Sequence, residues 1–219
     1  MNSSVTPPVA SGAGGALSRR LVRTALAAGV LTGGLTASAQ AAPAHRPGHS
    51  GDRGHSRVSV EVEHRTLTIT GTAGADKLSL RLSAGDPRRL QVDVGDDGSA
   101  DFTVRRRRFD RIVVNAGNGN DQVRIDESNG AVTTTTPTQI NGQGGDDTLL
   151  GGSGAETLNG GDGNDVVDGN GGADRVTLGS GDDRFVWDPG DGSDVVDGGA
   201  GHDAMTFNGS AARCDRRCN

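Results

Sequence analysis

Residues 142–206 repeat with a period of nine: GQGGDDTLL, GGSGAETLN, GGDGNDVVD, GNGGADRVT, LGSGDDRFV, the pair Trp187-Asp188, then PGDGSDVVD and GGAGHDAMT. The fourth place of every unit is glycine, the sixth is an acid and the eighth is apolar. The fourth-place glycines are Gly145, Gly154, Gly163, Gly172, Gly181, Gly192 and Gly201, and the sixth-place acids are Asp147, Glu156, Asp165, Asp174, Asp183, Asp194 and Asp203. Three properties locked to one short period predict a solenoid of identical units.

Each unit of nine residues has a glycine-rich half, which can turn sharply, and an x-apolar-x half, which can form a short strand. The alternation predicts an all-β protein. Burying one apolar side chain contributes roughly 2 kcal/mol per unit, whereas ordering the backbone costs about 1 to 2 kcal/mol for each residue. Glycine makes up 37 of the 219 residues and aromatic residues only 2%, so a large core cannot supply the difference.

The charge of the repeats points to a bound cation. Residues 141–207 hold fourteen Asp and Glu but only Arg175 and Arg184 as bases. Stacked strands would place like carboxylates about 4.8 Å apart, which is unfavourable in water. A hard cation removes this repulsion, and carboxylates with the carbonyls of tight glycine turns suit Ca²⁺. We therefore expect several calcium ions between successive turns.

The period resembles the GGxGxDxUx repeat of the RTX, or haemolysin-type, calcium-binding proteins. This resemblance implies a right-handed parallel β-roll, a β-helix solenoid in which each unit is half a coil. It also implies two turn stacks, one with Asp147, Asp165, Asp183 and Asp203 and the other with Glu156, Asp174 and Asp194. The remaining ligands would be backbone carbonyls of the turns around Gly145, Gly154, Gly163, Gly172 and Gly181. The insertion Trp187-Asp188 should offset the stack that follows it.

Residues 58–140 alternate apolar and polar side chains as strands do. Their turns are longer than in the repeats, which predicts a degenerate β-solenoid or a capping β region before the roll at 141–207. A separate small β-sandwich is the alternative. Two turns keep the glycine-acid-apolar signature, at 71–78 and 116–123, so Asp76 and Asp121 are additional candidate ligands.

The first 41 residues have the composition of a secretory signal peptide. Arg19, Arg20 and Arg23 precede an apolar run over 24–35, and small residues suited to cleavage follow it. The general and twin-arginine export routes both remain open. Because no second apolar segment follows, we expect a mature chain without a membrane span that is secreted to the extracellular space, where calcium is abundant.

Two further segments flank the β region. Residues 42–57 are rich in Pro, Gly, His and Arg, which predicts a flexible linker, with a transition-metal site on its three histidines as the alternative. The tail, 208–219, carries Cys214 and Cys218, and in an exported chain this pair predicts a disulfide. An intermolecular cross-link and a zinc site are the other interpretations.

The run Arg105–Arg108 suggests a patch for an anionic polymer or, as the simpler interpretation, a solvated loop. Acids balance bases over residues 42–140 and the whole chain has a net charge of −6, so a nucleic-acid partner is not expected.

No catalytic motif accompanies the repeats, and we expect no enzyme activity. The predicted function is a secreted, monomeric or weakly associating calcium-binding protein whose repeats fold into the β-roll on binding calcium. The alternatives are an extracellular adhesion or matrix module with a cell-surface or glycan partner, and a calcium-dependent polysaccharide lyase.

Overall fold

The computed structural model describes residues 57–209, and every structural statement below concerns this part of the chain. The predicted signal peptide, nearly all of the predicted linker and the predicted Cys214–Cys218 disulfide lie outside the described residues. Within 57–209, none of the helices has the length and apolar character needed to cross a bilayer. The described elements are β-strands and two short 3-10 helices, η1 (Arg106–Arg108) and η2 (Thr133–Thr135).

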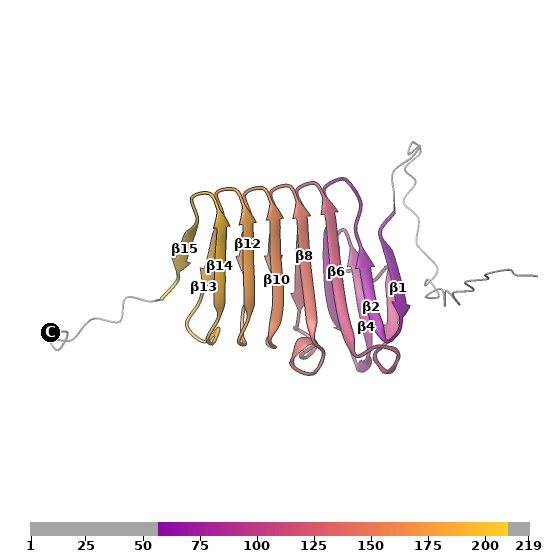
Figure 1. The fold of residues 1–219 in the computed structure, drawn as a ribbon. Helices are drawn as coiled ribbons and strands as arrows, with labels where there is room; N and C mark the ends of the chain where they lie inside the picture. Colours follow the sequence, from indigo (N-terminus) through magenta and orange to yellow (C-terminus); the bar gives the residue numbers. More distant parts are fainter. Residues whose placement is uncertain (1–56, 210–219) are drawn as a thin grey trace, which may run out of the picture. The chain divides into compact units, whose positions relative to one another are not determined.

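The strands form two sheets (Figure 1). The seven-stranded sheet has the order β1 (Ser59–Glu63), β2 (Thr66–Thr70), β6 (Arg111–Asn118), β8 (Thr138–Gly144), β10 (Glu156–Asp162), β12 (Arg175–Ser180) and β14 (Val195–Ala200). The eight-stranded sheet has the order β15 (Ala204–Phe207), β13 (Arg184–Trp187), β11 (Val166–Asp168), β9 (Thr148–Leu150), β7 (Gln122–Asp126), β3 (Lys77–Ser83), β4 (Asp86–Val94) and β5 (Phe102–Arg105).

From β6 onward, consecutive strands of the chain alternate between the two sheets, and every neighbour within a sheet is parallel. In the eight-stranded sheet Val167 pairs with Leu149 on one side and with Phe185 on the other. In the seven-stranded sheet Leu158 pairs with Ile140 and Val176. Two units of nine residues therefore make one complete coil, because the chain returns to the same sheet after passing through the other.

The sheets are mixed because the N-terminal strands add antiparallel pairs to the parallel rows. β1 pairs antiparallel with β2, and β4 pairs antiparallel with both β3 and β5. The β1–β2 connection is a two-residue hairpin turn whose residues His64 and Arg65 have φ of 46° and 64°, as a primed turn requires. The prediction of an all-β protein is confirmed. Residues 66–126 share both sheets with the repeats, since β2 pairs with β6 and β3 with β7.

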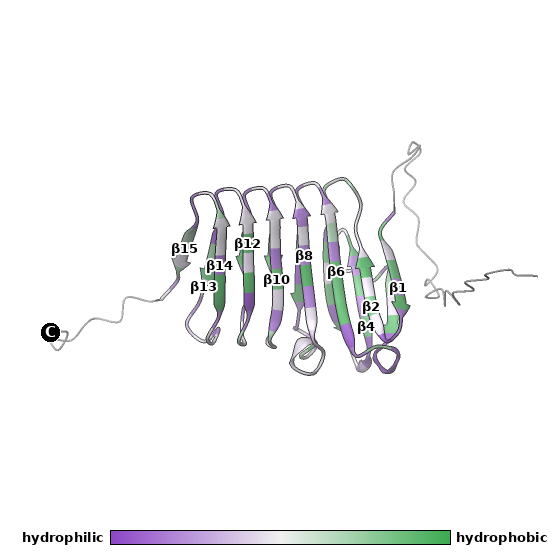
Figure 2. Ribbon diagram, viewed as in Figure 1, coloured by the Kyte–Doolittle hydropathy of each residue, from purple (hydrophilic) through white to green (hydrophobic). Residues whose placement is uncertain are grey.

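The interior between the sheets is lined by the eighth-place residues and their N-terminal counterparts. Leu149, Leu158, Val167, Val176 and Phe185 are at most 1% exposed. The same place is 37% and 63% exposed at Val196 and Met205, because no further described coil covers them. Hydrophobic colouring dominates β2 in Figure 2, whereas β10 is mostly white to purple. Apolar burial per strand thus falls from the N-terminal region into the repeats.

The insertion Trp187-Asp188 does not offset the stack, and that prediction was wrong. Phe185 pairs with Met205 across β13 and β15 in the register of the earlier coils. The turn absorbs the two residues: the backbone N–H of Asp191 donates to the Asp188 carbonyl at 3.1 Å, and the Trp187 ring stacks on Phe207 with centroids 4.6 Å apart. The strands keep their register because a slip would change which buried residues pair, whereas the turn can accommodate two extra residues.

Replacing Leu158 by alanine should lower the free energy of unfolding by about 2 to 5 kcal/mol, because Leu158 is fully buried between strands of adjacent coils. Met205→Ala, at the same place of an exposed unit, should stay within about 0.5 kcal/mol of the unmodified chain. Urea unfolding in calcium-containing buffer measures both, and equal effects would contradict the described packing.

Candidate metal centre

The sixth-place acids stand at the start of each repeat strand and form one row per sheet. Asp147, Asp165, Asp183 and Asp203 directly precede β9, β11, β13 and β15 of the eight-stranded sheet. Glu156 is the first residue of β10, and Asp174 and Asp194 directly precede β12 and β14 of the seven-stranded sheet. Asp76 and Asp121 precede β3 and β7, so they extend the first row into the N-terminal region.

Each row is a ladder of hydrogen bonds from backbone to carboxylate, with one rung per coil. The backbone N–H of Asp147 donates to Asp165 Oδ1 at 2.8 Å, and that of Asp165 donates to Asp183 Oδ1 at 2.7 Å. In the second row the N–H of Glu156 donates to Asp174 Oδ1 at 2.7 Å. The N–H groups of Asp147 and Asp165 lie just outside the parallel strands, and that of Glu156 belongs to the first residue of β10. At these strand starts the next coil supplies a side-chain acceptor instead of a carbonyl.

The second oxygen of each of these carboxylates is buried and has no hydrogen-bond partner among the described residues. The affected atoms are Oδ2 of Asp121, Asp147, Asp165, Asp174, Asp183 and Asp194, and Oε1 of Glu156. Apart from the half-buried Asp194, these residues are at most 3% exposed. A buried carboxylate oxygen without a partner is costly unless a proton or a cation satisfies it. The rows therefore present a regular series of orphaned anionic oxygens.

The first-place glycines leave the space in which these oxygens lie. A Cβ at Gly160 would collide with both Asp165 Oδ2 and the carbonyl oxygen of Leu178. A Cβ at Gly142 would likewise collide with Asp147 Oδ2 and the carbonyl oxygen of Gly160. Gly142 and Gly160 are thus each bordered by one orphaned carboxylate oxygen and one backbone carbonyl from the next coil.

The fourth-place glycines allow the coils to approach closely. Gly163 has φ of 126°, and a Cβ on it would collide with the carbonyl oxygen of Gly145 one coil earlier. Gly145, Gly172 and Gly181 also have positive φ. Gly154 is the exception among the five predicted positions: it is not in the positive-φ region, and its N–H donates to Thr133 Oγ1 at 2.9 Å. The coil before Gly154 is the irregular turn around η2, so a repeat neighbour is missing on that side.

Burial raises the pKa of the carboxyl groups inside the rows, and the neighbouring carboxylates add to the effect. The pKa of Asp147 and of Asp174 is raised to about 7, and that of Asp165, Asp121 and Glu156 to about 6. Burial is the larger cause in every case, because it disfavours the charged form. Near neutral pH, protons and a cation therefore compete for the carboxylates of the rows.

The ends of the rows differ from their centres. Asp76 is half-buried and its Oδ2 accepts a hydrogen bond from the N–H of Thr72 at 2.6 Å, so this oxygen is satisfied. Asp203 is exposed, and its Oδ1 accepts from Asp183 N–H at 3.2 Å. The structure thus places the orphaned, buried oxygens between Asp121 and Asp194 rather than at either end.

A second ladder, the outer ladder, runs along the fifth place of alternate units. The N–H of Asn164 donates to Asp146 Oδ1, that of Asp182 to Asn164 Oδ1 and that of His202 to Asp182 Oδ1, at 2.8 to 2.9 Å. Asn120 begins this row by accepting from Asp146 N–H at 3.1 Å. Amide and carboxylate alternate here, which keeps like charges apart. Reading every second unit would have revealed this pattern, since partners lie eighteen residues apart.

The two sixth-place rows, the inner rows, show no such alternation of amide and carboxylate. All members are acids, so a cation or protons must balance them. No three His, Cys, Asp or Glu side chains within 57–209 come together as a preassembled cluster. Each coil instead contributes one sixth-place carboxylate to each row, and backbone carbonyls are the other oxygens nearby. An all-oxygen set of this kind fits a hard, flexible-coordination cation such as Ca²⁺ better than a transition metal.

The stacked two-sheet coils with a carboxylate row at each turn define a class of repeat protein. The family model of the RTX calcium-binding nonapeptide repeat matches this chain in four copies, over residues 139–155, 150–185 and 190–209. These residues therefore carry RTX repeats, and the resemblance inferred from the sequence is confirmed. No curated protein and no solved structure matches the chain.

In a chelator, the calcium-free chain should hold its β structure better at pH 5 than at pH 8. The row carboxyls have pKa values raised to about 6 or 7 in the fold, against ordinary values of 3.8 for Asp and 4.5 for Glu, so the folded state binds more protons than the unfolded chain between pH 5 and pH 7. Stability therefore falls as pH rises from about 4, where the unfolded chain releases these protons, and levels off above about 7. The pKa values of Asp126 and Glu127 are lowered, so these groups are ionised throughout and do not contribute.

Far-UV circular dichroism between pH 5 and pH 8 measures this effect. The double substitution Asp147→Asn and Asp165→Asn should flatten the profile, since it removes two of the shifted groups. A β signal that grows toward pH 8 in the unmodified chain would contradict the raised pKa values.

Proposed function

We propose that the protein is a secreted calcium-binding protein whose RTX repeats form a right-handed parallel β-roll around calcium ions. The carrying observation is the series of buried, partnerless carboxylate oxygens, one per nine-residue unit from Asp147 to Asp194, of which those of Asp147 and Asp165 lie beside a backbone carbonyl of the next coil. The proposed ligands are the sixth-place carboxylates and the turn carbonyls. The central members Asp147, Glu156, Asp165, Asp174 and Asp183 combine burial with an orphaned oxygen.

The two ends of each row have weaker roles in this proposal. Asp121 and Asp194 each contribute an orphaned oxygen at the margin of the repeats, whereas the Asp76 oxygen is satisfied by Thr72 and Asp203 is exposed. We propose that the most tightly bound ions lie between the central coils, where carboxylates of successive coils face the same turn.

Calcium supplies the free energy that the repeats lack. Each unit buries one eighth-place side chain, which does not offset the entropy of ordering nine residues. One site held at about 100 times its dissociation constant contributes roughly 2.7 kcal/mol, and it also relieves the repulsion between stacked carboxylates. The roll is thus expected to form where calcium is abundant, which agrees with export to the extracellular space.

Secretion, a non-enzymatic role and an extracellular location belong to this proposal as expectations from the sequence. RTX repeats are a calcium-binding module, which supports a binding role rather than catalysis. An adhesion or matrix role remains the second candidate, and one feature of the N-terminal strands, described below, favours an anionic partner.

Calcium should convert the chelated chain at pH 7.5 from a weak to a strong β signal in far-UV circular dichroism, with reversal by chelator. Magnesium at the same concentration should not reproduce the change, because it demands near-ideal octahedral geometry and dehydrates reluctantly. An identical β signal with and without calcium would show that the roll stands without the ion, and would overturn the proposal of metal-coupled folding.

Asp165→Asn and Asp174→Asn, one in each row, should each weaken calcium binding by about ten- to a hundred-fold, the equivalent of losing one charge-assisted contact. An asparagine keeps an oxygen that can accept the rung hydrogen bond, so the ladder itself survives. The same substitutions should stabilise the calcium-free chain, because they remove a buried negative charge.

The matched control is Asp182→Asn, at the fifth place next to Asp183. Its side chain is 67% exposed and belongs to the outer ladder, so calcium affinity should change less than twofold. Calcium titration calorimetry measures all three variants. Equal losses at Asp165, Asp174 and Asp182 would mean that general surface charge, rather than the inner rows, attracts the ion.

A further inference from the structure

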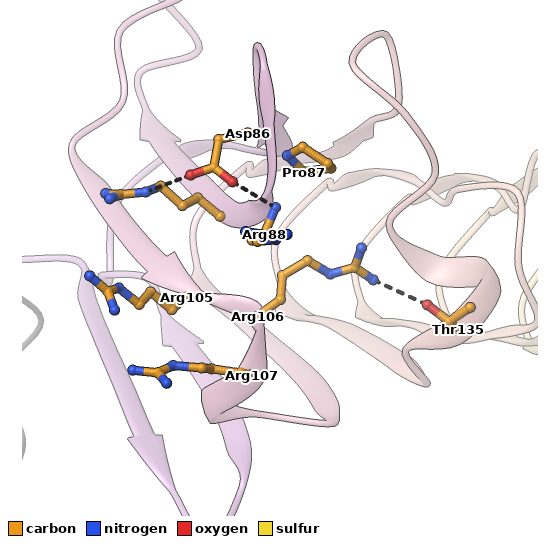
Figure 3. A pocket seen from close by; sticks show the side chains of 8 residues that line it. Asp86, Pro87, Arg88, Arg105, Arg106, Arg107 and Thr135 are labelled. Carbon is orange, nitrogen blue, oxygen red and sulfur yellow. Dashed lines mark hydrogen bonds and ion pairs between the residues drawn. The ribbon is translucent and has the colours of Figure 1, made fainter.

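A cluster of arginines lines a pocket formed by β4, β5, η1 and η2, and none of its lining residues is a sixth-place acid (Figure 3). The pocket has a volume of about 620 Å³, within the usual range for ligand sites. Its lining residues are Asp86, Pro87, Arg88, Arg89, Arg105, Arg106, Arg107 and Thr135. Five guanidinium groups thus share a pocket with a single carboxylate, in a chain whose net charge is −6.

Three chain segments that are separate in sequence build this basic pocket, and two of them supply its arginines. Arg105 at the end of β5 is the cross-strand partner of Arg89 on β4, so the pairing of β4 with β5 brings like charges together. Like charges opposite each other destabilise a sheet unless something compensates them. Asp86 Oδ2 accepts from Arg89 Nε at 3.0 Å, which neutralises one of the five. Arg88, Arg105 and Arg107 are exposed and have no carboxylate partner within residues 57–209.

Arg106 fixes one wall of the pocket without losing its charge. Its Nη2 donates to the Val132 carbonyl at 3.3 Å and to the hydroxyls of Thr135 and Thr136 at 3.1 Å, so it ties η1 to η2. All three acceptors are neutral. Figure 3 shows Arg106 turned toward Thr135, while Arg105 and Arg107 extend together in another direction. Arg106 is thereby held in place, whereas Arg105 and Arg107 lie exposed where an incoming group can reach them.

We propose that this pocket binds sulfate or phosphate esters carried by an anionic glycan. The planar fork of arginine matches tetrahedral oxyanions by paired hydrogen bonds, and several forks in one pocket favour a ligand with more than one such group.

Other polyanions fit less well. The lining has no aromatic side chain on which a nucleobase could stack. Within residues 57–209 the exposed large apolar residues are Val195, Val196, Met205 and Phe207, all on the C-terminal strands, so this part of the chain offers a membrane surface no apolar anchor beside the pocket.

Protection of a sheet edge is the competing explanation, since β5 is the last strand of its sheet and edge strands often carry basic residues. This explanation accounts for Arg105 but not for Arg88 and Arg107, which are not paired in β5. It also predicts no affinity for anions beyond that of any exposed arginine, which separates the two explanations experimentally.

The test is titration calorimetry of the calcium-loaded full chain with inorganic sulfate, inorganic phosphate and a heparin-derived hexasaccharide. We expect the hexasaccharide to bind more tightly than either free ion, because linked groups engage several guanidiniums at once. Arg105→Ala with Arg107→Ala should weaken hexasaccharide binding at least tenfold, and lysine at both positions should recover part of the loss. The control pair Arg175→Ala with Arg184→Ala makes the same charge change at exposed positions of β12 and β13, and should alter binding less than twofold.

Three results would overturn the proposal: no hexasaccharide binding by the unmodified chain, equal losses in the two double variants, or tighter binding to single-stranded DNA or to phosphatidylserine vesicles than to the hexasaccharide. Circular dichroism confirms that each variant keeps its calcium-dependent β signal. Because calcium binding is measured separately, failure here leaves the proposed calcium function intact, and failure of calcium binding does not remove the N-terminal pocket.

Discussion

The structure of the repeats depends on one interaction, the hydrogen bond from the backbone N–H of a sixth-place residue to the carboxylate of the sixth-place residue in the next coil. This bond joins Asp147 to Asp165 and Asp165 to Asp183 along one row. It satisfies an N–H at the start of a strand, but it also holds buried acids directly above one another. The geometry that closes the coil thereby brings like charges together in a buried place, and a cation or protons must balance them.

The outer ladder shows how the same geometry is satisfied without a cation. At the fifth place Asn164 stands between Asp146 and Asp182, so each carboxylate has an amide as its neighbour, and the row is exposed to water. An inner row of alternating Asn and Asp would close the coil equally well and would repel itself less. Backbone hydrogen bonding therefore does not require that every residue at the buried sixth place be an acid. The acids add negative charge instead, and this is the strongest argument from the structure for ion binding.

The sequence predicted those features that repeat with the nine-residue period. The acid rows, the buried eighth place up to Phe185 and the all-β class all follow from that period, because each unit has the same local environment. Features that depend on pairing across eighteen residues were not evident: the fifth-place ladder, the retained register after Trp187-Asp188, and the irregular neighbour of Gly154. The antiparallel direction of β1, β4 and β5 was not predicted either, since alternation alone does not distinguish strand directions.

The N-terminal strands and the repeats are stabilised by different means. Leu78, Leu80, Leu90 and Val92 are at most 1% exposed, so two neighbouring strands bury as many apolar side chains as four repeat units. Their buried aspartate, Asp93, is paired with Arg81 at 2.8 Å, whereas the buried acids of the repeats have no base beside them. The apolar-rich N-terminal region supplies the strand edges of β6 and β7 with which β8 and β9 pair. In the proposed calcium-driven ordering, the repeats would therefore extend an existing pair of sheets, which avoids the unfavourable nucleation of a first coil.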